Sequence, residues 1–253
     1  MKSKQTMASL GVFALMLVAW EFLPPALGVP RYILPTASET WRELMLMIPR
    51  DNLLRHFLST VAMTLLGFGI GSLFGATAGY LLGLSEFWEG VFSPYLLALQ
   101  IAPKVAFAPL FIMWFGYTFW PKLLVTVLIV FFPILVNVLQ AMRTIDRDQV
   151  NLARAYSMSP AQIFWKVEFP ASIPALMAGL RIGATLAVIG VTVGELVGGN
   201  TGLGFLITYG EGQANAAMVF NAILLLTLIG VALYSAVAAL EHRVLHYIPR
   251  VVR

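Results

Sequence analysis

The chain has 253 residues, of which 59% are hydrophobic and 11% are charged, and its mean hydropathy is +0.84. Soluble domains are about 45–50% apolar and about 25% charged, so this composition excludes a disordered chain, a coiled coil and an ordinary water-soluble enzyme. The net charge of +4 predicts basic loops beside a membrane rather than a nucleic-acid-binding surface. Cysteine is absent, and His56, His242 and His246 are too scattered to indicate a metal site.

Mostly apolar stretches with few charged residues predict six membrane-spanning helices, because about 20 apolar residues cross the hydrocarbon core as a helix. The first stretch follows Lys2 and Lys4 and is similar to a signal peptide. We favour an uncleaved span, because Pro24 and Pro25 follow without a clear small-residue cleavage site. The predicted spans are residues 7–20, 56–85, 90–114, 123–142, 173–197 and 216–240. The sequence therefore predicts an all-α membrane protein with a single transmembrane domain over residues 1–253.

A short helix that lies in the membrane surface is expected between the first two spans, at residues 36–48. Trp41, Leu44, Met45 and Ile48 recur there at helical spacing among charged residues.

The distribution of basic residues predicts that both termini are cytosolic. Cytoplasmic loops carry an excess of lysine and arginine, and this orientation places nine basic residues inside and five outside. The nine are Lys2, Lys4, Arg143, Arg147, Arg154, Lys166, Arg243, Arg250 and Arg253, and the five are Arg31, Arg42, Arg50, Arg55 and Lys122.

The second span carries a glycine at every fourth position. Glycine costs about 1 kcal/mol relative to alanine inside a helix, so five at one spacing need a reason. A glycine face lets another helix approach closely, and we interpret it as a packing face, with a face that slides during gating as the alternative. These helix-packing residues are Gly67, Gly71, Gly75, Gly79 and Gly83.

The segment from Arg143 to Pro174 predicts two short helices between the fourth and fifth spans. Asp146 or Asp148 can cap a helix at 148–156, and Ser159 with Gln162 forms a capping box for a second helix, which Phe169 and Pro170 should end. The two helices would either dock into a groove of a partner or lie on the lipid surface.

The run from Asn151 to Ser157, with Val167 to Pro170, resembles the EAA coupling loop of ABC-importer permeases. That family pattern is Glu-Ala-Ala-x-x-x-Gly followed later by Ile/Val-x-Leu-Pro. The runs GLRIG at 179–183, PKVAFAPLFIMWFG at 103–116 and GELVGGNTGLGFLI at 194–207 also resemble the branch that contains nitrate, taurine, alkanesulfonate, bicarbonate, riboflavin and thiamine-precursor permeases.

The resemblance implies the membrane subunit of an ATP-driven, binding-protein-dependent importer of a small solute in the bacterial inner membrane. It implies a type I importer bundle, a second copy of the permease, two cytosolic ATP-binding subunits and an extracytoplasmic substrate-binding protein. No cofactor is expected in this chain, since ATP and Mg would be bound by the partner ATPase and no Walker motif occurs. The coupling loop, about 144–172, would contact the ATPase through Asn151, Leu152, Ala153, Arg154, Ala155, Tyr156, Ser157, Ser159 and Pro170.

Two positions depart from the family pattern. Asn151 replaces the glutamate, which removes a negative charge from the docking helix. Ser157 replaces the glycine, and a serine in a left-handed conformation after the helix would cost on the order of 1 kcal/mol, unless the turn differs.

Ionisable and amide side chains inside the spans are candidates for the translocation pathway. Charges at this depth usually face a bundle interior or water. Lys104, between Pro103 and Pro109, would attract an anionic substrate or form a salt bridge with Glu195, and Arg181 would reach the cytosolic surface or pin the base of the bundle. The candidate pathway residues are Lys104, Asn137, Gln140 and Glu195, with hydrogen bonds between helices as the alternative role of the two amides.

An ion-coupled secondary transporter is the alternative function, with Lys104 and Glu195 as coupling groups. It leaves the two-helix loop unexplained, and no inverted repeat is visible. A membrane enzyme would need paired carboxylates, a Ser–His pair or metal-ligand spacing, and none stands out. The glycine-rich 198–204 loop lacks the ending of a phosphate-binding loop and is expected to be a flexible or re-entrant cap.

Overall fold

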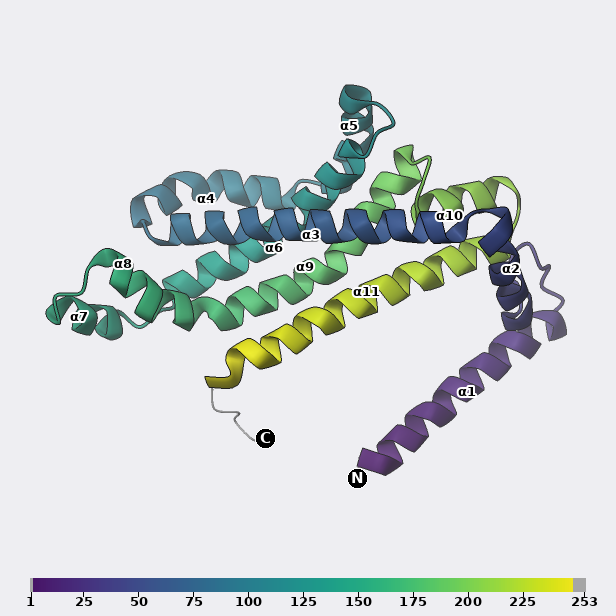
Figure 1. Ribbon diagram of the computed structural model, residues 1–253, viewed down its shortest axis with the longest axis horizontal. Coiled ribbons are helices and arrows are strands. Elements are labelled where there is room, and N and C mark those ends of the chain that lie inside the picture. The colour runs from purple at the N-terminus through teal and green to yellow at the C-terminus, as the bar shows by residue number, and fades with distance from the viewer. Residues whose placement is uncertain (1, 248–253) are drawn as a thin grey trace. The chain divides into compact units, whose positions relative to one another are not determined.

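The computed structural model describes residues 2–247, without the side chains of residues 2–4 and 247 (Figure 1). The side chains of Lys2 and Lys4, and all of Arg250 and Arg253, which enter the predicted orientation, therefore lie outside the described part of the chain.

The described residues form helices, and no β-strand occurs among them, so the predicted all-α fold is confirmed. The α-helices are α1 (Lys2–Ala26), α2 (Ala37–Arg50), α3 (Leu53–Gly83), α4 (Glu86–Ile101), α5 (Ala108–Phe115), α6 (Trp120–Arg143), α7 (Arg147–Ala155), α8 (Pro160–Ile163), α9 (Phe169–Gly198), α10 (Leu203–Gly212) and α11 (Ala216–Val244). Two 3₁₀ turns, η1 (Lys104–Phe107) and η3 (Leu245–Tyr247), and one π-helical turn, η2 (Phe164–Glu168), complete them.

Within residues 2–247, five helices are long and apolar enough to cross a membrane, and a bent pair makes the sixth candidate. The five are Gln5–Ala26, Leu53–Gly83, Trp120–Arg143, Pro160–Gly198 and Ala216–Val244. The third predicted span, 90–114, is not one straight helix, because α4 and the η1–α5 segment meet at 81°. The cause is Pro103, which offers no amide hydrogen and holds Ala102 in an extended conformation with ψ 135°.

Contacts divide the chain into two compact units. Unit 1 comprises Met1–Thr60 and Asn200–Thr227, and unit 2 comprises Val61–Gly199 and Leu228–Arg253.

In unit 2, α6 packs against glycine faces of both α3 and α9. A methyl group added to Gly67 of α3 would lie 2.4 Å from Thr126 Cγ2, and one added to Gly190 of α9 would lie 2.8 Å from Thr126 Cα. The five glycines of α3 meet α6 in a constant register, with Gly67, Gly71, Gly75, Gly79 and Gly83 against Thr126, Val130, Ile134, Val138 and Met142. This register makes α3 and α6 parallel, as the second and fourth of six successive spans must be.

Unit 1 ties the glycine-rich loop to α3. The Gly202 amide donates to His56 Nδ1 at 3.0 Å, and the Leu203 amide donates to Thr60 Oγ1 at 2.8 Å. Side chains of α3 therefore cap α10, whose own N-cap residue is a glycine. The loop expected to be flexible is held at this end because its buried amides need partners.

Helix α2 begins with a capping box, in which Thr36 Oγ1 accepts from the Glu39 amide and the Glu39 carboxylate accepts from the Thr36 amide. On its buried side, Asn221 Nδ2 donates to Thr40 O at 2.8 Å. Helix α1 meets α2 at its C-terminal end, where Trp20 Nε1 donates to Pro35 O and the Glu21 carboxylate accepts from Ser38.

Candidate functional site

Helix α7 has well-defined ends, as its sequence predicts. Asp146 is the N-cap, and its carboxylate accepts from the Asp148 amide. At the other end Ser157 takes a left-handed conformation with φ 56°. The Ser157 amide donates to Arg154 O and the Met158 amide to Ala153 O, which is a Schellman motif. The first of the two alternatives for Ser157 is therefore correct: serine occupies a left-handed position that suits glycine.

The second short helix runs directly into the next span. Ser159 and Gln162 form the predicted capping box of α8. The prediction that Phe169 and Pro170 end this helix is wrong, because a π-helical turn, η2, connects α8 to α9. Pro170 lies in the first turn of α9, where its missing amide hydrogen costs little. Pro160–Gly198 is therefore one helical segment of 39 residues.

An aromatic and hydroxyl cluster holds η2 against α3. Tyr80 of α3 makes a 2.9 Å hydrogen bond with Ser172 of α9. Its ring packs edge-on against Phe164 and tilted against Phe169. This contact links the two-helix loop to the α3–α6–α9 core, and the sequence alone gives no signal for it.

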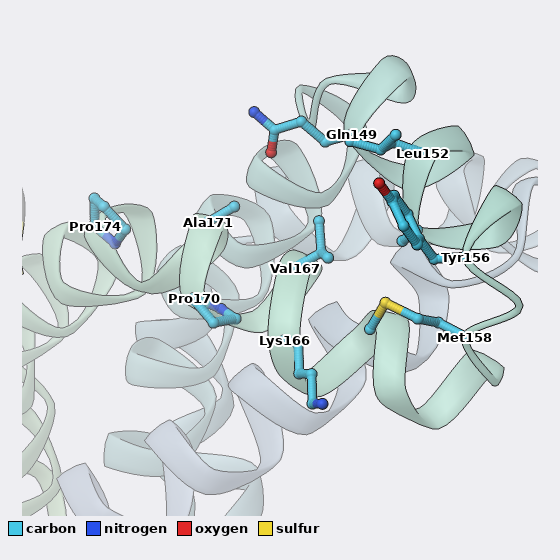
Figure 2. Close-up of a pocket in the computed structure, with 10 residues that line it drawn as sticks. Gln149, Leu152, Tyr156, Met158, Lys166, Val167, Pro170, Ala171 and Pro174 are labelled. Carbon is cyan, nitrogen blue, oxygen red and sulfur yellow. The ribbon is translucent and has the colours of Figure 1, made fainter.

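A mostly apolar groove of about 550 Å³ lies between α7 and the η2–α9 junction (Figure 2). Val167, Pro170 and Ala171 line one side, facing Leu152 of α7 and Tyr156, the C-cap residue of α7. Leu152 and Tyr156 are 59% and 77% exposed, although large apolar and aromatic side chains favour burial. Such a contiguous exposed apolar surface on a polar loop is typical of a protein interaction site.

A second cavity, of about 630 Å³, is lined by charged residues at the other side of α7. Arg143 pairs with Glu89, Arg147 pairs with Glu86 at 2.8 Å, and Arg154 acts electrostatically on Glu168. Asn151 lines this cavity, in which three arginines match three glutamates. A glutamate at position 151 would add an unmatched negative charge, so the local charge balance accounts for the asparagine.

Lys104 lies at the bend between α4 and η1. Its Nζ donates to Gln100 O at 2.5 Å and to Ala102 O at 3.3 Å, and lies 4.8 Å from the centre of the Phe132 ring. The ammonium group therefore caps the carbonyl end of α4, as a cation at a helix C-terminus should. No Lys104–Glu195 salt bridge occurs in the described structure.

Glu195 of α9 faces Lys122 of α6 instead. The two groups interact electrostatically and are 0% and 4% exposed, respectively. They meet where a methyl group on Gly194 would lie 2.6 Å from Lys122 Cα. Lys122 is therefore a buried, partnered charge.

The remaining polar residues of the spans have local partners or an exposed surface. Asn137 Nδ2 donates to Pro133 O of its own helix at 2.8 Å, and Gln140 is exposed. Arg181 of α9 pairs with Glu241 of α11 at 3.1 Å, an intramolecular link within unit 2.

Comparison with known proteins identifies the family. The family model described as "Binding-protein-dependent transport system inner membrane component" matches residues 67–246. The chain belongs to this family. The permease is 34% identical over 245 residues to the formylaminopyrimidine transport permease ThiX of Halalkalibacterium halodurans, covering 95% of this chain and 96% of the relative. It is 35% identical over 227 residues to the riboflavin transport system permease RibX of Chloroflexus aurantiacus, covering 90% and 85%.

The fold of the permease is also that of a solved importer. A structure of inward-facing conformations of the MetNI methionine ABC transporter aligns with a TM-score of 0.64 and 23% identity, covering 76% of this chain and 95% of that chain. Because the family model begins at residue 67, α1 and α2 lie outside it.

Exposure divides the nine residues that the resemblance assigns to ATPase contact. Ala153 is 6% exposed and lines the groove from its buried side. Seven of the nine are exposed: Asn151, Leu152, Arg154, Ala155, Tyr156, Ser157 and Ser159. Pro170 lines the groove. Trp165 of η2 is also 62% exposed, and sequence reasoning missed it because its neighbours indicated a buried face.

Proposed function

We propose that the permease forms a translocation pathway with a second copy of itself and is driven by two cytosolic ATPases that dock on the α7–α8 loop. The observation that carries the proposal is the exposed apolar groove formed by α7, η2 and the start of α9. An extracytoplasmic binding protein would deliver the solute, as the family description implies. The chain itself would bind neither ATP nor Mg, and hydrolysis would belong to the partner subunit.

The helix connections explain how the loop would transmit motion. Because α8, η2 and α9 are continuous, a displacement of α8 moves the start of the span directly. The Tyr80–Ser172 contact and the glycine faces join α9 to α6 and α3, so the core moves with it. Alternating access needs only such packed helices with two arrangements.

We propose that both termini are cytosolic. Two ion pairs, Arg143–Glu89 and Arg147–Glu86, place the α3–α4 connection beside the α6–α7 connection, as expected for two loops on one membrane side. In unit 1, the α2 segment contacts the segment after α9, and both should be extracytoplasmic. The count of nine basic residues inside against five outside supports the same orientation.

For the substrate, we propose a small solute, with a vitamin precursor favoured over a sulfonate-like or nitrate-like anion. The relatives ThiX and RibX are named for formylaminopyrimidine and riboflavin. Lys104 is engaged with helix carbonyls and the Phe132 ring, which weakens the case for an anion site there. Gln140, exposed on α6, remains the candidate for solute contact, with Asn137 one turn before it.

An ion-coupled transporter has no specific support. Glu195 is 0% exposed and interacts electrostatically with Lys122, whereas a coupling carboxylate would have to exchange its ion with water.

A single-cysteine experiment tests the proposal, because the chain has no cysteine of its own. Leu152→Cys should cross-link to the ATPase subunit and be labelled only from the cytosolic side. Thr208→Cys, at an exposed position of α10, is the matched control and should react only from the other side. Labelling of Leu152→Cys from the extracytoplasmic side, without any ATPase cross-link, would overturn the proposal.

A further inference from the structure

Helix α2 presents an apolar stripe to its surroundings although it belongs to a charged segment. Trp41, Met45 and Ile48 are 63%, 43% and 51% exposed and are spaced by four and three residues, which places them on one face. An adjacent face, with Thr40 and Met47, is buried in unit 1.

The position of α2 in the chain holds this stripe at the membrane surface. Only Asp51 and Asn52 separate α2 from α3, a candidate span. The other end of α2 contacts the end of α1, also a candidate span, through Trp20 and Glu21. An amphipathic helix tied to the ends of two spans lies in the interface, with its apolar face toward the acyl chains.

A cavity of about 530 Å³ opens beside this stripe within unit 1, lined by charged side chains of α2 and its preceding loop and by the α10–α11 connection. Its two carboxylates already have partners. Glu39 pairs with Arg31 at 2.9 Å, and Glu43 pairs with Arg50 and accepts from Asn215 Nδ2 at 2.7 Å. Hydrogen bonds to Asp51 and Glu43 raise the pKa of Arg50, so the guanidinium stays charged.

Arg42 is different, since it lines the cavity without an ion-pair or hydrogen-bond partner among the described residues. It follows Trp41 and so lies roughly a quarter of a turn from the apolar stripe. The Tyr32 hydroxyl, another donor without a described partner, lines the same cavity. The cavity therefore offers a guanidinium and a phenol without described partners at headgroup depth, while its carboxylates are engaged in ion pairs.

From this arrangement we propose that the cavity binds the phosphate of an anionic membrane lipid, through Arg42 and Tyr32, while the Trp41–Met45–Ile48 stripe contacts the acyl chains. A guanidinium binds phosphate oxygens in a bidentate manner, and a phenol hydroxyl adds a donor. The site depends on neither ATPase coupling nor the orientation of the permease, so it can fail while the proposed function holds.

The test uses the full-length permease purified in mild detergent, as wild type, Arg42→Gln and Arg55→Gln. Arg55 is an exposed arginine of the same unit that does not line the cavity, so it is the matched control. Phosphatidylglycerol should raise the melting temperature of wild type and Arg55→Gln. Arg42→Gln should bind phosphatidylglycerol at least about tenfold more weakly, measured as the lipid retained through purification. Phosphatidylcholine and inorganic phosphate should have no comparable effect.

Three outcomes would overturn the proposal. Equal retention of phosphatidylglycerol by all three proteins would show that Arg42 is not a ligand. An equal response to inorganic phosphate would identify a free-ion site instead of a lipid site. If Arg42→Gln loses solute uptake but retains as much lipid as wild type, Arg42 binds an acidic side chain of a partner protein instead of a lipid. If Arg42→Gln fails to fold, Arg42→Lys and Tyr32→Phe provide the same comparison, each with weaker retention than wild type.

Discussion

Glu195 and Lys122 form a buried charge pair between α9 and α6, in the part of unit 2 where glycine allows the two helices to touch. Glu195 is 0% exposed and Lys122 is 4% exposed. The pair therefore holds two spans of the core together rather than lining an open pathway.

Removing one charge of this pair should destabilise the permease. Glu195→Gln leaves Lys122 buried without its counter-charge, which costs about 3–5 kcal/mol when a buried pair is broken. Thermal unfolding in detergent should show a clear drop for Glu195→Gln and for Lys122→Met. The double variant should recover much of the loss, and a double variant no better than the two singles combined would contradict the pairing.

Substitution by alanine at two glycines of α3, Gly75 and Gly69, should change the stability of the permease differently. A methyl group on Gly75 would lie 2.6 Å from the Phe131 carbonyl oxygen, whereas one on Gly69 meets nothing within 4 Å. Gly75→Ala should therefore lose about 1–3 kcal/mol through overpacking. Gly69→Ala should be neutral or gain up to about 1 kcal/mol of helix propensity. Equal melting temperatures of the two variants would mean that α3 and α6 are not packed at this distance.

Replacing Ser157 by glycine should stabilise the end of α7. The residue has φ 56°, where glycine avoids a cost of about 1 kcal/mol that any side chain carries. Ser157→Ala is the control, since it keeps the strain. Hydrogen exchange of the Ser157 and Met158 amides should slow in the glycine variant only. Slower exchange in Ser157→Ala as well would show that the serine hydroxyl, not the backbone, destabilises the turn.

A glutamate at position 151 should disturb the charge balance around α7 instead of improving coupling. It would bring a fourth carboxylate to a cavity with three arginines. The energetic effect should be small, about 0–1 kcal/mol, because position 151 and all three arginines are exposed. ATPase stimulation should fall in Asn151→Glu and return when Glu168→Gln is added. Higher stimulation in the single variant would show that the partner, not this cavity, determines the residue.

Local sequence signals predicted much of this fold. The Ser159–Gln162 box, the Asp146 cap and the glycine spacing of α3 each act within a few residues, so they can be recognised without a structure. Mostly apolar stretches located the spans for the same reason.

Signals that depend on distant residues were less visible. The partner of Glu195 is 73 residues away in the sequence, and no local pattern distinguishes Lys122 from a surface lysine. Pro170 indicated the end of a helix, because the π-helical turn before it cannot be predicted from composition. Lys104 reads as an anion site because the bend that gives it helix carbonyls forms only when α4 ends.

The most direct test of the central claim measures solute uptake and ATP hydrolysis by the complete importer in proteoliposomes. Three forms of the permease are compared: the wild type, Tyr156→Phe and Tyr156→Asp. If the exposed groove beside α7 is the docking surface, Tyr156→Phe should retain both activities, whereas Tyr156→Asp should release the ATPase subunits and lose uptake while the permease keeps its melting temperature. Wild-type uptake by Tyr156→Asp, with the ATPase still bound, would contradict the account.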